Sequence, residues 1–247
     1  RADSSEIVMG TEYAICCAVW EPGFIEENTL KIFFYDTSQQ RSSWKLFLIA
    51  DEVYREFIYD GVEHVSVLDL PAIPDRAVLV DSISKQYSAC GARIGCIVSR
   101  NEELMATVLK FGQARLCPPT VDQIAATAAM SVPDSYFEDV RAEYVKRRDL
   151  TCDARASIPG VICQKPRGAF YTVAKLPVDD AEKFAVFLLD AFDLDGETVM
   201  VAPAAGFYAT PGAGLDEVRI AYVLNTADLE KAMRAFASGL DAYAGSR

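Results

Sequence analysis

Short apolar runs that stop at charged or hydroxyl residues are the clearest pattern along this chain of 247 residues. One run covers residues 46–50 and stops at Asp51, a second covers residues 77–80 and stops at Asp81, and a third covers residues 94–98. Continuous apolar runs of this length predict strands buried on both faces of a sheet. The first two are too far apart for a hairpin, so the chain between them can cross over and make them parallel.

Helical spacing of apolar residues dominates the rest of the chain. Four stretches show it: residues 120–130, 136–154, 180–194 and a last stretch that begins near Thr226. In the first stretch Ile124 and Ala128 share one face, and Thr226 is the predicted N-cap of the last stretch. Residues 169–174 and 218–223 are predicted strands. Because the pattern breaks at residues 158–160, we predict two domains, 1–150 and 151–247.

Charge and composition narrow the possible partners. Lys and Arg total 24 against 36 Asp and Glu, a net charge of −12, so we expect neither nucleic acid nor an anionic membrane surface as a partner. No apolar run approaches the ~20 residues that span a bilayer. The chain begins at Arg1 without a Met or a signal peptide, so we expect a fragment or a processed chain.

The cysteines and the single histidine argue against several kinds of site. Seven scattered cysteines without a CxxC pair predict reduced thiols in a cytoplasmic protein, with no metal site. His64 lies in a polar setting and is predicted to be a surface residue. With one histidine in the chain, a Ser-His-Asp triad or a multi-histidine metal centre would depend on that residue alone.

Chemically distinct polar residues gather at the ends of the first two predicted strands and just beyond them. They are Asp51, Tyr54, Ser82, Ser84, Lys85 and Arg93. Open α/β sheets bind ligands at the carboxyl ends of their strands, so we expect these side chains to share a site. These side chains suit one type of ligand, a ring with a basic nitrogen, a carbonyl, a phenolic oxygen and a phosphate. They supply an acid, a phenol, two hydroxyls, an amine and a guanidinium.

The same residues carry a family resemblance. Asp51-Glu-Val-Tyr54, followed by Ser82-Ile-Ser-Lys85 and Gly91-Ala-Arg93-Ile-Gly95, resembles the cofactor-binding pattern of pyridoxal-phosphate-dependent class I/II aminotransferases, the aspartate aminotransferase-like enzymes of fold type I. Further matches lie at residues 113–120, 166–171, 202–212 and 218–222.

The resemblance implies an α/β fold. It implies a partial, mainly parallel large-domain sheet with helices, which binds pyridoxal 5'-phosphate, within residues 1–150, and a smaller C-terminal α+β domain over residues 151–247. Residues 1–45 look diverged or replaced. A homodimer is implied by the resemblance only.

The resemblance also implies roles. Lys85 would form the internal aldimine and move the substrate's Cα proton. Asp51, as a buried carboxylate, would pair with the pyridine nitrogen, and Tyr54 would donate a hydrogen bond to the phenolic oxygen. The residues implied for the phosphate are Ser82, Ser84 and Arg93. Those implied for substrate are Arg219, at the α-carboxylate, and Arg115, at a distal carboxylate. Gly91, Gly95 and Gly168 are interpreted as tight-turn or close-approach positions.

The start of the chain departs from the family pattern. Family members extend further at the N-terminal side, where a phosphate-binding loop and a ring-stacking aromatic residue lie. Their Asn-Pro-x-Asn-Pro-Thr-Gly motif should fall near residues 21–23, where this chain has Glu21-Pro-Gly23. The carboxylate of Glu21 cannot donate a hydrogen bond as Asn does.

Three hypotheses for function follow. The first is an aminotransferase that moves an amino group between an aspartate-like amino acid and a 2-oxo acid. The second is another fold type I enzyme, such as a β-lyase or a synthase. The third is a truncated, non-catalytic homologue.

Overall fold

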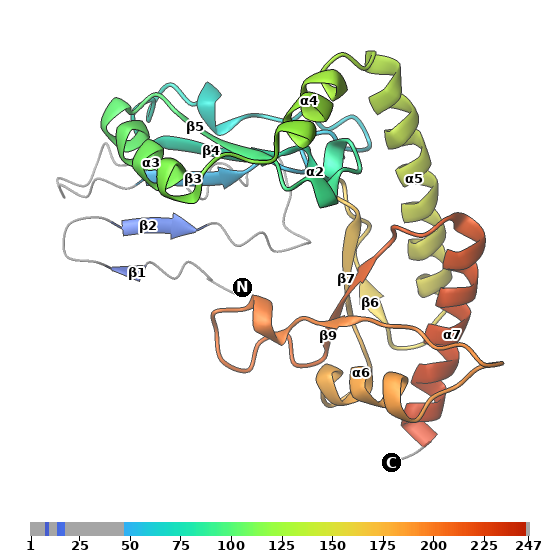
Figure 1. Ribbon diagram of the computed structural model, residues 1–247. Helices are drawn as coiled ribbons and strands as arrows, with labels where there is room; N and C mark the ends of the chain where they lie inside the picture. Colours follow the sequence, from blue (N-terminus) through green and yellow to red (C-terminus); the bar gives the residue numbers. More distant parts are fainter. Residues whose placement is uncertain (1–7, 10–13, 18–46, 246–247) are drawn as a thin grey trace. The chain divides into compact units, whose positions relative to one another are not determined.

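The computed structural model describes residues 8–9, 14–17 and 47–245, with side chains described from residue 47 on, and it forms two compact units (Figure 1). The pocket unit contains the described residues up to Arg141, and the C-terminal unit begins at Ala142. Residues 21–23, where the Asn-containing motif was expected, lie outside the described residues. No described helix is long and apolar enough to cross a bilayer.

The pocket unit contains a sheet with the strand order β1-β2-β3-β4-β5. Its strands are β1 (Val8–Met9), β2 (Ala14–Cys17), β3 (Phe47–Asp51), β4 (Ala77–Ser82) and β5 (Gly95–Ser99). Its helices are η1 (Val67–Asp69), α2 (Ile83–Gln86), η2 (Cys90–Ala92), α3 (Glu102–Arg115) and α4 (Thr120–Ala129). The helix α5 (Asp134–Ala156) begins in this unit and continues into the C-terminal unit.

The pairing of β3, β4 and β5 sets the geometry of this unit. β3 and β4 are parallel, as predicted, with Asp51 opposite Val80. β5 runs antiparallel to β4, with Ser82 opposite Gly95. The prediction that the third apolar run is buried on both faces is wrong. Ile97 and Val98 are 42% and 40% exposed, because β5 is an edge of the described sheet.

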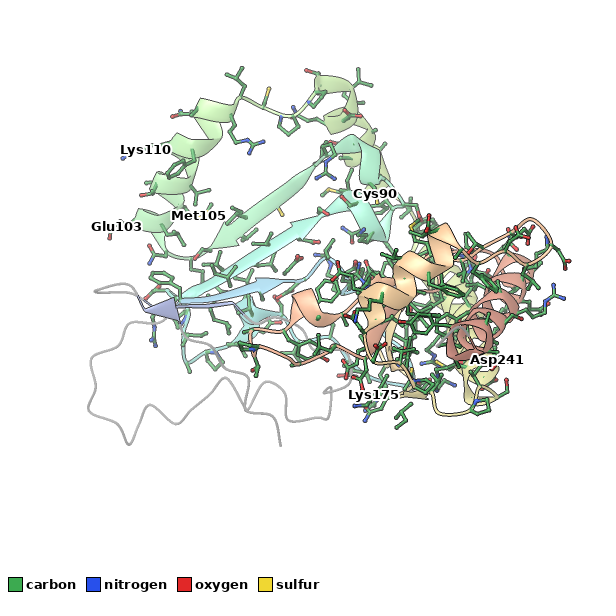
Figure 2. The ribbon with its side chains drawn as sticks, turned by 90° about the horizontal axis from the view of Figure 1, so that it is seen from below. Cys90, Glu103, Met105, Lys110, Lys175 and Asp241 are labelled. Atoms are coloured by element: carbon green, nitrogen blue, oxygen red, sulfur yellow. The ribbon has the colours of Figure 1, made fainter. Side chains whose placement is uncertain are left out.

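One core cluster of the pocket unit lies on one face of β3 and β4. The buried side chains of Val67, Leu70, Ala77 and Leu79 form it. The helices contribute little, since α3 buries none of its residues and α4 buries Ala126 alone. Glu103 and Lys110 project from the side of α3 that points away from the sheet (Figure 2).

The predicted buried face of α4 is a second correction. The helix forms where its spacing predicts it, but Ile124 and Ala128 are exposed and Ala126 is the buried residue. Apolar spacing identifies a helix, but it does not say whether another element of the described chain covers that face.

The C-terminal unit contains an antiparallel sheet with the strand order β6-β7-β9-β8. Its elements after α5 are β6 (Ile162–Cys163), β7 (Tyr171–Lys175), α6 (Ala181–Asp190), β8 (Ala202–Pro203), η3 (Ala205–Phe207), β9 (Glu217–Ala221) and α7 (Thr226–Gly245). The two predicted strands correspond to β7 and β9, which pair with each other.

The core of the C-terminal unit is larger. The apolar stripes of α6 and α7 supply Phe184, Leu188, Phe236 and Leu240, each at most 5% exposed, and the sheet supplies Ala174 and Val218, among others. The predicted N-cap of the last helix is wrong by one residue. Thr226 is the first helical residue, and Asn225 Oδ1 accepts the hydrogen bond from the Asp228 N–H at 3.0 Å.

The start of β5 generates a stability prediction. A Cβ added at Gly95 would lie 2.7 Å from the Asp81 carbonyl oxygen, so Gly95→Ala should force β4 and β5 apart locally. We expect a loss of about 1–3 kcal/mol in the free energy of unfolding, measured by urea denaturation.

Gly91→Ala is the matched control. A Cβ at Gly91 would meet no described atom within 4 Å, and Gly91 does not have a positive φ. Its cost should stay within about 0.5 kcal/mol. Equal losses for the two variants would contradict the close approach at Gly95.

Candidate active site

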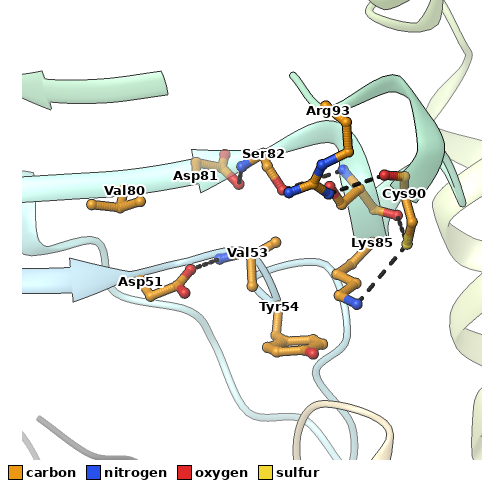
Figure 3. A pocket seen from close by; sticks show the side chains of 10 residues that line it. Asp51, Val53, Tyr54, Val80, Asp81, Ser82, Lys85, Cys90 and Arg93 are labelled. Carbon is orange, nitrogen blue, oxygen red and sulfur yellow. Dashed lines mark hydrogen bonds between the residues drawn. The ribbon is translucent and has the colours of Figure 1, made fainter. Parts of the chain in front are cut away.

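One pocket collects the six residues predicted from the strand ends. Asp51, Tyr54, Ser82, Ser84, Lys85 and Arg93 all line a cavity of about 320 Å³, together with Val53, Val80, Asp81 and Cys90 (Figure 3). The strand register explains why they meet. Parallel β3 and β4 end side by side, and antiparallel β5 begins where β4 ends.

The segment after β4 folds back on itself to line the pocket. Ser82 caps α2, and its Oγ accepts a hydrogen bond from the Ser84 N–H at 3.3 Å. Arg93 has a left-handed backbone with φ 54°, which turns the chain into β5. An Arg93 Nη donates to the Cys90 carbonyl at 3.0 Å. Ser82 at the end of β4 and the twelve residues between β4 and β5 therefore place two hydroxyls, an amine and a guanidinium around one space.

Cys90 lies next to the pocket amine. Its Sγ is 3.9 Å from Lys85 Nζ, and the thiol donates to the Ser84 carbonyl at 3.0 Å (Figure 3). Sequence reasoning missed Cys90 because it treated all seven cysteines as scattered thiols. The one available signal was its position between Lys85 and Arg93.

Two carboxylates line the pocket in different environments. Asp51 is exposed, which corrects the expectation of a buried carboxylate, and its Oδ1 accepts from the Val53 N–H at 3.2 Å. Asp51 is the last residue of β3, and it lines the cavity. Asp81 is the buried acid, at 7% exposure.

Asp81 is held by an ion pair with Arg55, which also donates to Gln86 Oε1 at 3.2 Å. Burial raises the pKa of Asp81, against the lowering effects of the Ser82 N–H, which donates at 2.7 Å, and of Arg55. Sequence reasoning did not include Asp81 in the site. It could have been found, because it ends the second apolar run just as Asp51 ends the first.

Neither of the two predicted substrate residues is among those that line the pocket. Arg115 is the last residue of α3, it is exposed, and it is not one of the residues that line the pocket. Arg219 lies on β9 in the C-terminal unit, where its guanidinium carbon is 4.7 Å from the centre of the Tyr171 ring and 4.8 Å from that of Phe207. Two aromatic rings therefore fix the position of this guanidinium.

His64 is exposed, as predicted, and does not line the pocket. Its Nε2 lies 2.9 Å from an oxygen of Glu52, and the buried Glu52 carboxylate also accepts from the Val67 N–H at 2.7 Å. This cluster ties η1 to the end of β3.

The chemistry of the pocket's side chains fits a phosphate-bearing aromatic aldehyde. Ser82, Ser84 and Arg93 offer hydroxyl and guanidinium donors for an anion. Lys85 offers a nucleophilic amine, and Asp51 offers a carboxylate for a protonated ring nitrogen. Among the described residues, no group of three His, Cys, Asp or Glu side chains is placed to hold a metal ion.

Comparison with known proteins agrees with this chemistry. Residues 38–236 match the family described as Aminotransferase class I and II. The aspartate aminotransferase of Rhizobium meliloti is 29% identical over 210 residues, which cover 79% of this chain and 48% of that protein. The arginine–pyruvate transaminase of Pseudomonas aeruginosa is 33% identical over 199 residues, which cover 78% of this chain and 47% of that protein.

Solved structures give the same result. The aspartate aminotransferase of Rhizobium meliloti superposes with a TM-score of 0.67 at 27% identity, over 79% of this chain and 50% of that one. The aromatic aminotransferase of Pyrococcus horikoshii superposes with a TM-score of 0.69 at 30% identity, over 80% of this chain and 52% of that one. The chain spans about half the length of these relatives. With its fold type I architecture, the chain belongs to the class I and II aminotransferase family, whose members are pyridoxal-phosphate-dependent enzymes.

Proposed function

We propose that the pocket binds pyridoxal 5'-phosphate and that the chain serves in the transfer of an amino group between an aspartate-like amino acid and a 2-oxo acid. The observation that carries this proposal is the convergence of Asp51, Lys85 and Arg93 on one cavity at the ends of β3 and β4. When bound, this cofactor supplies an aldehyde that condenses with amines and a ring that accepts electrons from the substrate's Cα.

Different residues of the pocket bind different groups of the cofactor. Arg93 and the hydroxyls of Ser82 and Ser84 bind the phosphate, because a guanidinium offers parallel N–H donors to two oxygens at once. Asp51 stabilises a protonated ring nitrogen, and the Tyr54 hydroxyl donates to the phenolic oxygen. Because Asp51 is exposed and lines the cavity, its carboxylate is accessible to a ligand.

Lys85 is the proposed catalytic residue. Its amine would hold the cofactor's aldehyde and would carry the proton from the substrate's Cα. The contact of Nζ with Cys90 Sγ and the hydrogen bond of Cys90 to the Ser84 carbonyl restrict where this amine can move.

Arg219 is proposed to bind the substrate's α-carboxylate. The rings of Tyr171 and Phe207 hold the guanidinium plane in place, so little conformational freedom is lost when the fork engages a carboxylate. Arg115 is proposed for the distal carboxylate of a dicarboxylic substrate. A homodimer and a cytoplasmic location remain predictions.

Titration with pyridoxal 5'-phosphate tests the site directly. We expect a visible absorption band in the unmodified chain and, after borohydride reduction, the cofactor fixed to Lys85 and identified by peptide mass mapping. Lys85→Ala should lose the trapped adduct. Lys110→Ala removes an exposed lysine on α3 of the same unit and should keep it.

The outcomes separate the three hypotheses. No band and no adduct on Lys85 would support a non-catalytic homologue. A band that an amino acid converts stoichiometrically to pyridoxamine phosphate supports the aminotransferase. Release of pyruvate and ammonia instead would identify a β-lyase.

Protection of Cys90 from alkylation gives a readout independent of turnover. Cys90 lines the pocket, whereas Cys117 is exposed just beyond α3 and does not line it. Saturating cofactor should slow iodoacetamide modification of Cys90 at least about tenfold, the loss expected when a bound ligand occupies about 90% of the pocket. Cys117 should react at an unchanged rate, followed by mass spectrometry. Equal rates at Cys90 with and without cofactor would place the cofactor elsewhere.

Arg219→Lys tests the carboxylate fork. A point charge replaces two parallel donors, so we expect the amino-acid concentration for half-conversion of the cofactor band to rise about tenfold, equivalent to about 1.4 kcal/mol. Cofactor affinity should not change. The control is Arg234→Lys, an exposed position on α7. An unchanged amino-acid dependence in Arg219→Lys would remove this residue from the substrate site.

A further inference from the structure

The pocket holds an amine and a thiol in contact with each other. Lys85 Nζ donates to Cys90 Sγ across 3.9 Å, and the Cys90 thiol donates in turn to the Ser84 carbonyl at 3.0 Å (Figure 3). Both side chains line the cavity, and Cys90 is exposed. Cofactor binding, as proposed above, uses the amine, but it leaves the thiol without a chemical role.

The backbone between the two residues brings them together. Lys85 lies in the last turn of α2, and Tyr87 is the C-cap of that helix. Ser88 then adopts a left-handed backbone with φ 52°, which is uncommon for a residue with a Cβ, and its N–H donates to the Lys85 carbonyl at 3.1 Å. This turn closes a short loop in which the Cys90 sulfur faces the Lys85 amine.

The surroundings of the sulfur are those of an oxidisable thiol. Arg93 also lines the cavity, and one of its Nη atoms donates to the Cys90 carbonyl at 3.0 Å, so two basic side chains lie close to residue 90. Of the two carboxylates of the cavity, Asp81 is paired with Arg55. Accessible cysteines beside Lys and Arg are the kind that peroxides oxidise to sulfenic acids.

We propose that Cys90 is a modification site at which hydrogen peroxide produces a covalent sulfenamide bond between Cys90 Sγ and Lys85 Nζ. The bond forms without any cofactor, so the modification itself does not depend on the proposed function. Its consequence rests on that function, since a Lys85 amine bonded to sulfur cannot condense with the cofactor's aldehyde. The cross-link would therefore block the cofactor site until a reductant removes it.

The oxidation balances in two steps. The Cys90 sulfur attacks one oxygen of hydrogen peroxide, the O–O bond breaks, and the thiol becomes a sulfenic acid with the release of one water. The neutral Lys85 amine then attacks that sulfur, the S–O bond breaks, and the leaving hydroxide takes a proton from the nitrogen to form a second water. The protein loses two hydrogen atoms, and the peroxide is reduced to two waters.

A dithiol such as dithiothreitol reverses the modification. One of its thiols attacks Cys90 Sγ, the S–N bond breaks, and the Lys85 amine is released with a proton from the reagent. The second thiol of the reagent then attacks the mixed disulfide, frees the Cys90 thiol and leaves oxidised dithiothreitol.

The trypsin cleavage pattern of the full chain tests the proposal. Trypsin cuts after Arg76, Lys85 and Arg93, so Lys85 and Cys90 normally fall in separate peptides. After treatment with hydrogen peroxide and alkylation of the remaining thiols, we expect one peptide of residues 77–93 that is uncut after Lys85, carries no alkyl group and is two hydrogens lighter than the unmodified stretch. Dithiothreitol should restore the cut. An intact cut after Lys85 at peroxide concentrations that fully oxidise the exposed Cys117 would overturn the proposal.

Single variants assign the roles of the two groups. Cys90→Ser should keep the cut after Lys85 at every peroxide concentration, because the sulfur is absent. In Lys85→Arg no primary amine captures the sulfenic acid, which should accumulate on Cys90 and be trapped by dimedone. Cys117→Ser, the matched control, removes an exposed thiol outside the cavity and should form the cross-link as the unmodified chain does. A blocked cut in Cys90→Ser would overturn the assignment. If a variant fails to fold, as judged by circular dichroism, the map of the unmodified chain decides alone.

Competition with the cofactor separates this proposal from the proposed function. With pyridoxal 5'-phosphate bound at about 90% occupancy, the rate of cross-linking at a fixed peroxide concentration should fall about tenfold. A cross-link that forms at the same rate with and without cofactor would contradict the role of Lys85 in cofactor binding and support the modification site alone. A chain that develops the visible cofactor band but never the cross-link would overturn the modification site alone.

Discussion

The alignment of three strand ends is the constraint on which the candidate site depends. β3 and β4 run parallel with Asp51 opposite Val80, so the chain leaves both strands at the same end of the sheet. β5 runs in the opposite direction, with Ser82 opposite Gly95, so it begins at the end of the sheet where β4 finishes. Gly95 permits this pairing, because a side chain at that position would collide with the Asp81 carbonyl oxygen. A shift of one residue in either pairing would point the polar side chains to the other face of the sheet.

A partly buried ion pair supports this arrangement. Asp81 lines the cavity at 7% exposure, and its charge is matched by Arg55, which the loop after β3 supplies. Removing Arg55 would leave the buried Asp81 carboxylate without its charged partner, which is more destabilising than the loss of an exposed pair. The pair therefore joins the loop that carries Tyr54 to β4, which leads directly into α2 with Lys85, and it leaves Asp51 as the accessible carboxylate of the cavity.

Local sequence patterns predicted α4 to α7, the strands β3, β4, β5, β7 and β9, and six of the residues that line the pocket, because these follow from spacing and from where an apolar run stops. They did not predict α3, Asp81 or Cys90. The direction and exposure of β5 were not predictable in the same way. They depend on which strands lie beside it. An apolar run such as residues 94–98 can form either an edge strand or a central strand of a sheet, so its composition does not distinguish the two. The exposure of Ile124 and of Asp51 has the same origin, since burial is decided by elements distant in sequence. Asn225 caps α7, and the sequence did not distinguish it from Thr226, because both residue types are favourable N-caps.

The two units also differ in what they bury. In the pocket unit α3 buries none of its side chains and α4 buries only one, while apolar residues such as Leu109 and Phe111 are exposed. In the C-terminal unit a full apolar core coexists with buried Arg148 and Arg155 on α5. A core of Phe184, Leu188 and Phe236 has no need of buried arginines for stability, since well-packed apolar residues are often at least as stabilising as buried charges. On this polar face the interaction with Cys152 lowers the pKa of Cys163, and the Thr172 side chain and the positive charge of Arg155 lower it further.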